Sequence, residues 1–172
     1  ILKQFQDFGW DAHIETYQVL YPTPVSEALD IANLGGKPWK ATLQERPLPG
    51  DSSSTAKDKA LPAYLAFQGD GDVTAPLVYV NYGNADDYKR LEQLGISVKG
   101  KIVITRYGQG WRGLKVKLAQ DHGAVGALIY SDPADDGYSV DGVYPKGAMR
   151  PAQGFQRGSV ACEEDYALRR LP

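Results

Sequence analysis

The segment from residue 100 to 136 limits the possible folds more than any other part of the chain. Two apolar runs, 101–105 and 125–130, enclose a basic glycine turn and a helix-like segment, and the acidic sequence SDPADD follows. Short runs rich in Val and Ile favour strands. The order therefore predicts strand, turn, helix, strand and turn, with a right-handed crossover if the two strands lie parallel in one sheet.

The same segment concentrates positive charge. Between residues 101 and 120 it carries five cations and no carboxylate, although the net charge of the whole chain is only −2: Lys101, Arg106, Arg112, Lys115 and Lys117. A local excess of one charge sign attracts ligands of the opposite sign. We therefore expect an anion to bind in this segment.

The composition is that of one ordinary globular domain. A chain of 172 residues, with 42% hydrophobic and 23% charged residues, has room for a single core and a short flanking piece. No apolar run approaches the roughly 20 residues that cross a bilayer, and no signal-peptide pattern is present. We therefore expect no membrane contact from this chain.

Metal, cofactor and nucleic-acid sites are not expected from these residues. A zinc site needs several converging ligands, and the chain has only two histidines and one cysteine. The glycine turn contains neither a convincing dinucleotide motif nor a Walker motif. The chain is mildly acidic and its tyrosines are scattered, which argues against nucleic-acid binding.

Periodicity and turn residues predict elements outside the basic segment as well. These are a helix over 1–8, a strand over 13–20, a hairpin about Gly35-Gly36, an exposed connection over 47–58, a strand over 77–80 and a helix over 86–94. Within the basic segment, LKVKL at 114–118 alternates like a strand, whereas the following AQDHG is typical of a helix that ends at glycine. Periodicity alone does not decide between the two.

Four blocks of the sequence resemble a known family. They are YVNYG at 79–83, GKIVITRYG at 100–108, WRGLKVKLAQDHGAVGALIYSDPAD at 111–135 and FQRGS at 155–159. Together they are similar to the protease-associated, or apical, domain inserted in the glutamate carboxypeptidase II-like zinc peptidases. That group includes the N-acetylated-alpha-linked acidic dipeptidases, their bacterial relatives and the inactive transferrin receptors. The ending QRGS is more similar to the bacterial relatives, which predicts a bacterial source and weakens the expectation of glutamate specificity.

The resemblance implies a fold and a division of the chain. The fold would be α+β, a mixed β-sandwich or open barrel flanked by helices, with a helix over about 113–122. Residues 1–60 would be the end of a first peptidase-domain segment with a connecting hairpin, and residues 61–159 the protease-associated domain. Residues 160–172 form a tail that does not match the family.

Arg112 is the main candidate site residue. A guanidinium can bind a carboxylate through two parallel hydrogen bonds, and the start of a helix favours an anion. From the residues alone, a solvated surface arginine or a partner for the carboxylates of SDPADD is the more common outcome. The resemblance instead implies that Arg112 reaches into the active site of the peptidase and binds the free α-carboxylate of the substrate's C-terminal residue.

Two further residues complete the candidate substrate-binding site, and no catalytic residue is expected. The family's second contact is an asparagine after QRG, and Ser159 stands at that position with one hydroxyl donor in place of two amide donors. Ser159 could equally be an ordinary turn residue. Trp111 is included because it abuts Arg112.

The acidic turn after the basic segment has two interpretations. Its carboxylates could bind calcium, which takes several oxygen ligands: Asp132, Asp135, Asp136 and Asp141. The sequence Asp-Pro-Ala-Asp is also ordinary turn chemistry, in which aspartate accepts local N–H bonds. We favour the turn.

The resemblance also implies a function. The chain would be a fragment of a secreted zinc-dependent exopeptidase, inactive by itself, that covers the active-site cleft and helps to bind the substrate carboxylate. Two zinc ions would be held by the remaining peptidase domain, and the substrate would be a peptide with a free C-terminus. The parent would be extracellular, periplasmic or at the cell surface, and it could be homodimeric. The alternative is a noncatalytic protein-binding module of a receptor-like or inactive homologue.

Overall fold

The structure is a computed structural model that describes residues 1–161. Its elements are, in chain order, α1 (Leu2–Asp7), β1 (Asp30–Leu34), β2 (Lys37–Lys40), the 3-10 turns η1 (Ser52–Thr55) and η2 (Lys57–Lys59), β3 (Leu65–Ala66), β4 (Leu77–Tyr79), α2 (Ala85–Gln93), β5 (Ile102–Arg106), α3 (Arg112–Asp121), β6 (Gly126–Tyr130) and β7 (Gly158–Ser159). The mixed fold of strands and helices is as expected. The strands form three small sheets, β1-β2, β3-β7 and β4-β5-β6.

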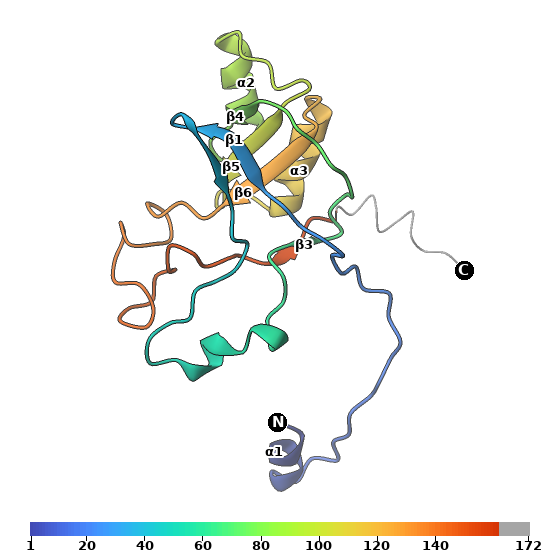
Figure 1. The fold of residues 1–172 in the computed structure, drawn as a ribbon. Helices are drawn as coiled ribbons and strands as arrows, with labels where there is room; N and C mark the ends of the chain where they lie inside the picture. The colour runs from blue at the N-terminus through green and yellow to red at the C-terminus, as the bar shows by residue number, and fades with distance from the viewer. Residues whose placement is uncertain (162–172) are drawn as a thin grey trace, which may run out of the picture.

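The central sheet has the order β4-β5-β6, and all its strands are parallel (Figure 1). Val103 of β5 pairs with Val78 of β4 on one side and with Ala127 of β6 on the other. Two strand–helix–strand units therefore follow one another, with α2 and α3 as the connecting helices. The runs at 101–105 and 125–130 were predicted to be strands; they form β5 and β6, and the structure adds that the two pair in parallel.

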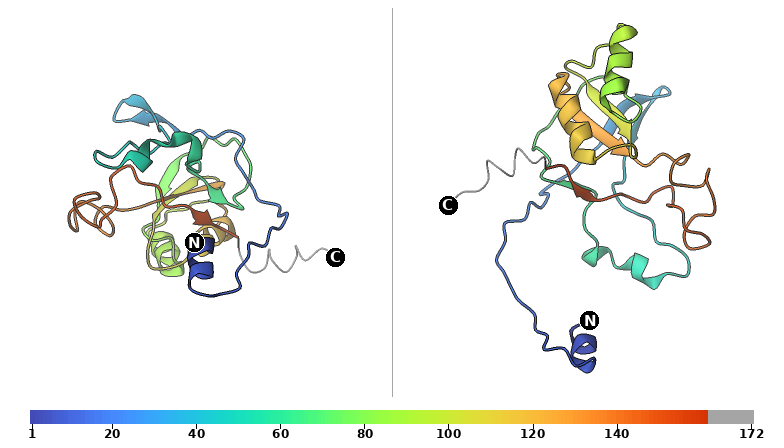
Figure 2. Two further views of the ribbon diagram at one scale, coloured as in Figure 1. Left: turned by 90° about the horizontal axis from the view of Figure 1, so that it is seen from below. Right: turned by 180° about the vertical axis from the view of Figure 1, so that it is seen from behind.

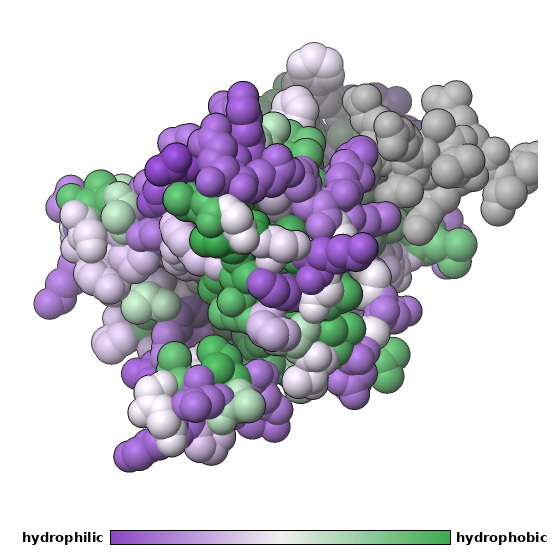
Figure 3. All heavy atoms as spheres, turned by 90° about the horizontal axis from the view of Figure 1, so that it is seen from above, coloured by the Kyte–Doolittle hydropathy of each residue, from purple (hydrophilic) through white to green (hydrophobic). Residues whose placement is uncertain are grey.

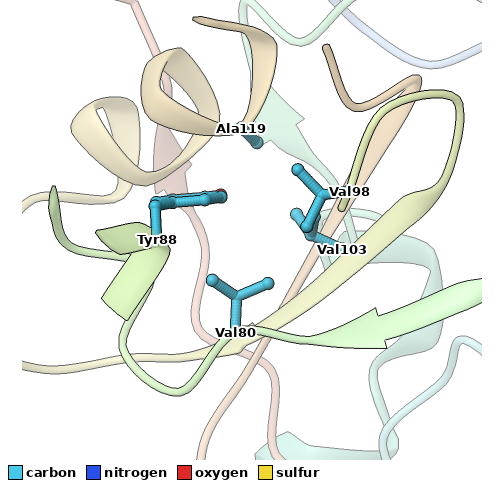
Figure 4. Close-up of a cluster of buried hydrophobic side chains, with 5 residues drawn as sticks. All are labelled: Val80, Tyr88, Val98, Val103 and Ala119. Atoms are coloured by element: carbon cyan, nitrogen blue, oxygen red, sulfur yellow. The ribbon is translucent and has the colours of Figure 1, made fainter. Parts of the chain in front are cut away.

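The core lies between this sheet and its two helices. It is built from Val80, Tyr88, Val98, Val103 and Ala119, of which Tyr88 belongs to α2 and Ala119 to α3 (Figure 4). Because Val103 is fully buried at the centre of the sheet and contributes to this cluster, both helices cover the same face. The core therefore fixes α3 against β5 and β6.

The helix over 112–121 settles the ambiguous sequence LKVKL. Lys115 and Ala119 are buried and stand four residues apart, which places them on one face of a helix. The segment is helical despite its strand-like alternation, because the helix face that carries Lys115 and Ala119 packs on the sheet. The helix predicted over about 113–122 is therefore present, and in the structure it extends from Arg112 to Asp121.

Lys115 is a buried cation that links three elements. Its Nζ donates a hydrogen bond to the carbonyl oxygen of Gly108 at 2.8 Å, and a second to the carbonyl oxygen of Tyr82. Burial lowers the pKa of Lys115. The lysine therefore holds the first turn of α3 against the ends of β4 and β5.

Two smaller sheets lie beside the central one (Figure 2). Strands β3 and β7 pair in parallel, with Ala66 opposite Ser159, and the backbone N–H of Val160 donates to Ala66 at 3.0 Å. The hairpin β1-β2 turns at Gly35 and Gly36, both with positive φ, as predicted from this glycine pair. The β3-β7 pairing also places residues 158–161 beside the first turn of α3, where a Cβ atom at Gly113 would lie 3.1 Å from the carbonyl oxygen of Val160.

The strand predicted over 13–20 is wrong for this structure. Within residues 1–161 these residues form no strand, and the apolar side chains of Ile14, Tyr17 and Val19 are more than 70% exposed. An alternating sequence becomes a strand only where a neighbouring strand supplies hydrogen bonds and a packing surface. In Figures 1 and 2 this segment instead runs outside the sheets to α1, which lies apart from the other elements.

The connection over 47–58 is largely exposed, as predicted, and it also contains short 3-10 turns that the sequence did not indicate. It contains η1 and the beginning of η2, and Asp51 caps η1 by accepting the backbone N–H of Ser53. The Tyr144 hydroxyl donates to Asp51 at 3.0 Å, so this connection contacts the segment after the acidic turn. The division near residue 60 and the tail boundary at 160 stay predictions, and most of the tail, 162–172, lies outside the described residues.

The surface mixes hydrophilic and hydrophobic side chains, with hydrophobic ones gathered toward the centre of the face in Figure 3. Over the described residues, no helix is long and apolar enough to cross a membrane.

Tyr88 provides the first test of this core. Its hydroxyl is buried and has no hydrogen-bond partner within residues 1–161, and burial raises its pKa from 10.0 to about 12. We expect Tyr88→Phe to raise the free energy of unfolding at pH 7 by about 1 kcal/mol, because an unpaired buried polar atom is removed. Denaturant unfolding measures this. A loss above 1 kcal/mol would show that the hydroxyl has a stabilising partner.

The raised pKa of Tyr88 also predicts that the stability of the protein depends on pH. Because the Tyr88 pKa is higher in the folded protein, its contribution to the free energy of unfolding should be constant below pH 10 and should decrease between pH 10 and 12. The expected decrease from Tyr88 is roughly 2 to 3 kcal/mol. Tyr88→Phe should lose less stability than wild type over that range. At pH 7 the contrasting variant is Tyr82→Phe, because the Tyr82 hydroxyl donates to Asp135 at 3.0 Å and its loss should destabilise the protein.

Lys115→Met tests the link between α3 and the strand ends. Methionine fills similar space but leaves the carbonyl oxygens of Tyr82 and Gly108 without this donor, so we expect a loss of about 2 to 4 kcal/mol. The melting temperature should fall by roughly 5 to 15 °C. Lys89→Met, on the exposed side of α2, should change it little. Equal melting temperatures for the two variants would contradict the role of Lys115.

Candidate functional site

A pocket of about 750 Å³ lies at the start of α3. The turn after β5, the first turn of α3 and the segment around β7 surround it. Its lining residues are Tyr107, Gly108, Gly110, Trp111, Arg112, Gly113, Leu114, Lys117, Gln156, Ser159 and Ala161. The structure therefore brings together all three residues predicted from the sequence, Trp111, Arg112 and Ser159.

The position of this pocket follows from the parallel sheet. Ligands of open α/β sheets commonly bind outside the carboxyl ends of the strands. Tyr107 and Gly108 directly follow β5, and Lys115 holds α3 at this edge through the carbonyl oxygens of Gly108 and Tyr82. The first residue of α3, Arg112, is thereby placed at the pocket.

The Arg112 guanidinium is confined by three neighbours. Its Nη2 donates to Oε1 of Gln156 at 3.1 Å, and its central carbon lies 5.5 Å from the centre of the Tyr107 ring. Gly158 approaches it so closely that a Cβ atom there would lie 2.5 Å from Nη1. Any side chain at 158 would therefore displace the guanidinium.

Arg112 has no anionic partner among residues 1–161. No carboxylate lies within salt-bridge distance of it in this part of the chain, and its Nε is buried with no hydrogen-bond acceptor. Burying a polar group without a partner costs free energy. Apart from the Nη2 bond to Gln156, the Nη1 and Nη2 groups have no hydrogen-bond partner in this part of the chain, and these are the donors that an added acceptor could use.

Arg106 is the cation that pairs with the acidic turn. Its Nη1 lies 3.3 Å from Asp135 and 3.7 Å from Asp132, and its Nη2 donates to Asn81 at 2.9 Å. Its guanidinium also stacks over the Tyr82 ring, 3.9 Å from the ring centre. One alternative for Arg112, a partner for the SDPADD carboxylates, is thus excluded because Arg106 occupies that role.

Two of the other cations in the basic segment also have internal partners. Lys115 is buried against backbone carbonyls, and Lys117 pairs with Asp121 one turn further along α3, at 2.9 Å. The charge excess of the sequence therefore does not act as one uniform anion site. Most of these cations make separate contacts within the chain. Of the two arginines in the segment, Arg106 pairs with carboxylates, whereas Arg112 has no carboxylate partner in the described residues.

Ser159 and Trp111 lie at the same pocket in different ways. The Ser159 oxygen accepts the backbone N–H of Ala161 at 3.1 Å, which is a local turn contact, and its hydroxyl proton is not used in that bond. Trp111 is the N-cap of α3 and 84% exposed, and its side chain does not cap the helix. Trp111 is therefore available for contact with another molecule or domain.

The carboxylates after β6 form turn contacts. Asp132 accepts the backbone N–H of Ala134 at 2.9 Å, and this bond, followed by the Tyr130 hydroxyl and the Arg106 charge, lowers the pKa of Asp132. Asp136 pairs with Arg150 at 2.9 Å, and Asp141 accepts the N–H of Gly142. These bonds support the turn interpretation over calcium binding.

The described residues do not fit a zinc site. Within 1–161 there is no group of three or more histidine, cysteine, aspartate or glutamate side chains that could hold a metal ion. A cocatalytic zinc pair needs several such ligands at once. Any zinc chemistry would depend on residues beyond this part of the chain.

Three residues that contact Arg112 at the pocket were not predicted from the sequence: Tyr107, Gln156 and Gly158. The last two lie in the FQRGS block that carries the resemblance, and Tyr107 lies in the GKIVITRYG block. Their membership in those blocks was a usable signal. The contacts of Gln156 and Gly158 with Arg112 were not predictable, because both residues are more than 40 positions from Arg112 in the sequence and reach it only through the fold.

Comparison with known proteins assigns the family. The PA domain family model matches residues 73–161, slightly more than half of the chain. A probable glutamate carboxypeptidase of Arthroderma benhamiae is 41% identical over 161 residues, which cover 91% of this chain and 22% of the relative. The aminopeptidase NAALADL1 of Rattus norvegicus is 44% identical over 107 residues, 60% of this chain and 14% of the relative.

Among solved structures, the aminopeptidase from Aneurinibacillus sp. strain AM-1 has a TM-score of 0.49 at 22% identity, covering 92% of this chain and 27% of that one. This likeness is too weak to carry an argument. The chain spans about a fifth of the length of its glutamate carboxypeptidase relative. The match over residues 73–161 is the stronger finding, and it shows that this chain belongs to the PA domain family.

Proposed function

We propose that this chain is the PA domain part of a zinc-dependent exopeptidase of the glutamate carboxypeptidase and aminopeptidase group. In the complete protein the domain covers the active-site cleft and binds the carboxylate at the C-terminus of the peptide substrate. The names of the relatives support the peptidase class, and the small share of their length that this chain spans supports a domain within a longer enzyme.

The observation that carries this proposal is the state of Arg112. It lines an open pocket, is held by neutral groups, and has no carboxylate partner in the described residues, whereas the nearby Arg106 is paired. A guanidinium held in a fixed orientation presents donors that match the two oxygens of a carboxylate. A peptide's free C-terminus would supply those oxygens.

Ser159 and Trp111 have supporting parts in this proposal. The Ser159 oxygen is held by the Ala161 N–H, so its hydroxyl proton can be donated to the same carboxylate. The exposed Trp111 indole covers the apolar part of the substrate's last residue or contacts the peptidase domain. Neither residue takes part in breaking the peptide bond.

The domain would contribute binding and orientation. Fixing one end of the substrate raises the effective concentration of the scissile bond at the reacting groups. Those groups, with two zinc ions that would activate water, belong to the remaining peptidase domain of the parent chain. That domain is the second partner we propose, in a parent that is secreted, periplasmic or at the cell surface.

Arg112→Lys in the complete enzyme tests the carboxylate contact. Lysine keeps the charge but loses the planar pair of donors, and a charge-assisted hydrogen bond contributes about 1.5 to 3 kcal/mol. We expect kcat/KM for peptides with a free C-terminus to fall on the order of ten- to a hundredfold. C-terminally amidated peptides should be affected much less.

The control for this variant is Arg90→Lys, on the exposed side of α2, which should leave both substrates unchanged. Equal losses for free and amidated peptides with Arg112→Lys would mean that Arg112 maintains the structure. In that case the proposed function would lose its main support.

The isolated chain provides a second test. We expect it to bind no stoichiometric zinc and to hydrolyse no peptide, because its described residues bring together no set of zinc ligands. Metal analysis after dialysis and a panel of dipeptides measure both properties. Turnover that survives purification and is abolished by a chelator would contradict the proposal that the catalytic groups lie elsewhere.

A further inference from the structure

Gln156 makes the direct side-chain hydrogen bond to Arg112. Its Oε1 accepts from Nη2 at 3.1 Å, and both residues line the same pocket. A guanidinium has only donors, so the amide must turn its oxygen toward it. The amide nitrogen Nε2 is then the end of Gln156 that Arg112 does not use.

This amide nitrogen has no partner within residues 1–161. The other hydrogen bond made by Gln156 is at its backbone, where the carbonyl oxygen accepts the Tyr107 hydroxyl at 3.0 Å. The Nε2 group therefore adds two neutral donors beside the unpaired donors of Arg112. Donors grouped in this way suit a carboxylate, which accepts through two oxygens.

The backbone of Gln156 is held on both sides. The Arg157 side chain pairs with Glu45 at 3.0 Å and donates to the carbonyl oxygen of Leu61 at 2.7 Å. Gly158 pairs with Leu65 in the β3-β7 sheet. Because these contacts fix the segment before a ligand arrives, the amide needs little ordering when the ligand binds.

We propose that Gln156 is a second contact for the substrate carboxylate: its Oε1 orients Arg112 and its Nε2 donates to the same carboxylate. This inference rests on the proposed function, since it concerns the ligand of the same pocket. It gives Gln156 two roles, as a positioning residue for Arg112 and as a specificity residue for peptides with a free C-terminus. Ser159 alone would offer a single hydroxyl donor.

The test uses the complete enzyme and the ratio of kcat/KM for a free peptide to that for its C-terminally amidated form. Gln156→Met keeps the length of the side chain and removes both amide functions, so the ratio should fall about tenfold. Gln156→Glu should lower it at least as much, because a new carboxylate would pair with Arg112 and repel the substrate. Gln120→Met, on the exposed side of α3, is the matched control and should leave the ratio within twofold of wild type.

A double variant separates direct contact from positioning. If Nε2 donates to the substrate, Gln156→Met should lower the ratio a further threefold or more in a protein that already carries Arg112→Lys. No further loss in that background would show that Gln156 acts only through Arg112, and the direct contact would be overturned. Melting temperatures near wild type for the single variants confirm that the comparison is between folded proteins.

The two proposals fail in different ways. If Arg112→Lys lowers the ratio and Gln156→Met leaves it unchanged, the inference about Gln156 is wrong and the proposed function stands. If Arg112→Lys leaves the ratio unchanged, the pocket does not bind the carboxylate and both proposals fail.

Discussion

The buried ammonium group of Lys115 is the contact on which the arrangement of the site depends. It bonds to the carbonyl oxygens of Tyr82 and Gly108, which follow β4 and β5, and so fixes where α3 starts relative to the sheet. A cation removed from water is stable only when its donors are satisfied, so this position allows little variation. Arg112, one turn before Lys115, is therefore held at the carboxyl edge of the sheet.

The remaining charges of the segment are distributed according to their neighbours. Arg106 is neutralised by Asp132 and Asp135 and packs on Tyr82, which makes it part of the framework that holds the acidic turn. Arg112 is surrounded by the neutral groups of Tyr107, Gln156 and Gly158. Two arginines six residues apart thus differ in their surroundings, because Arg106 pairs with carboxylates of its own chain and Arg112 lines a pocket.

Much of the central fold could be predicted from the sequence. The apolar runs and the helical spacing indicated β4, α2, β5 and β6 because these elements pack in one local unit, and local pattern then agrees with the fold. Periodicity left 114–118 undecided, since the alternation of LKVKL resembles a strand while a single buried face makes it helical. The strand predicted over 13–20 failed because no partner strand meets it within residues 1–161.

The candidate site could be predicted only in part from the sequence. Arg112, Trp111 and Ser159 followed from a resemblance, and the structure places all three at one pocket. The sequence could not show that Arg106 takes the carboxylates of the turn, nor that Gln156 reaches Arg112, because both contacts join segments that are distant along the chain. Long-range contacts of this kind depend on the register of β5 with β6 and of β3 with β7.

The account's central claim is that Arg112 is positioned to bind the C-terminal carboxylate of a peptide. The most direct measurement is a crystal structure of the complete enzyme with a bound peptide or its C-terminal product. We predict the ligand carboxylate within about 2.7 to 2.9 Å of the Arg112 guanidinium nitrogens, with Gln156 still in contact with Arg112. A carboxylate bound by other residues, with Arg112 paired to an acidic side chain of the peptidase domain, would contradict the claim.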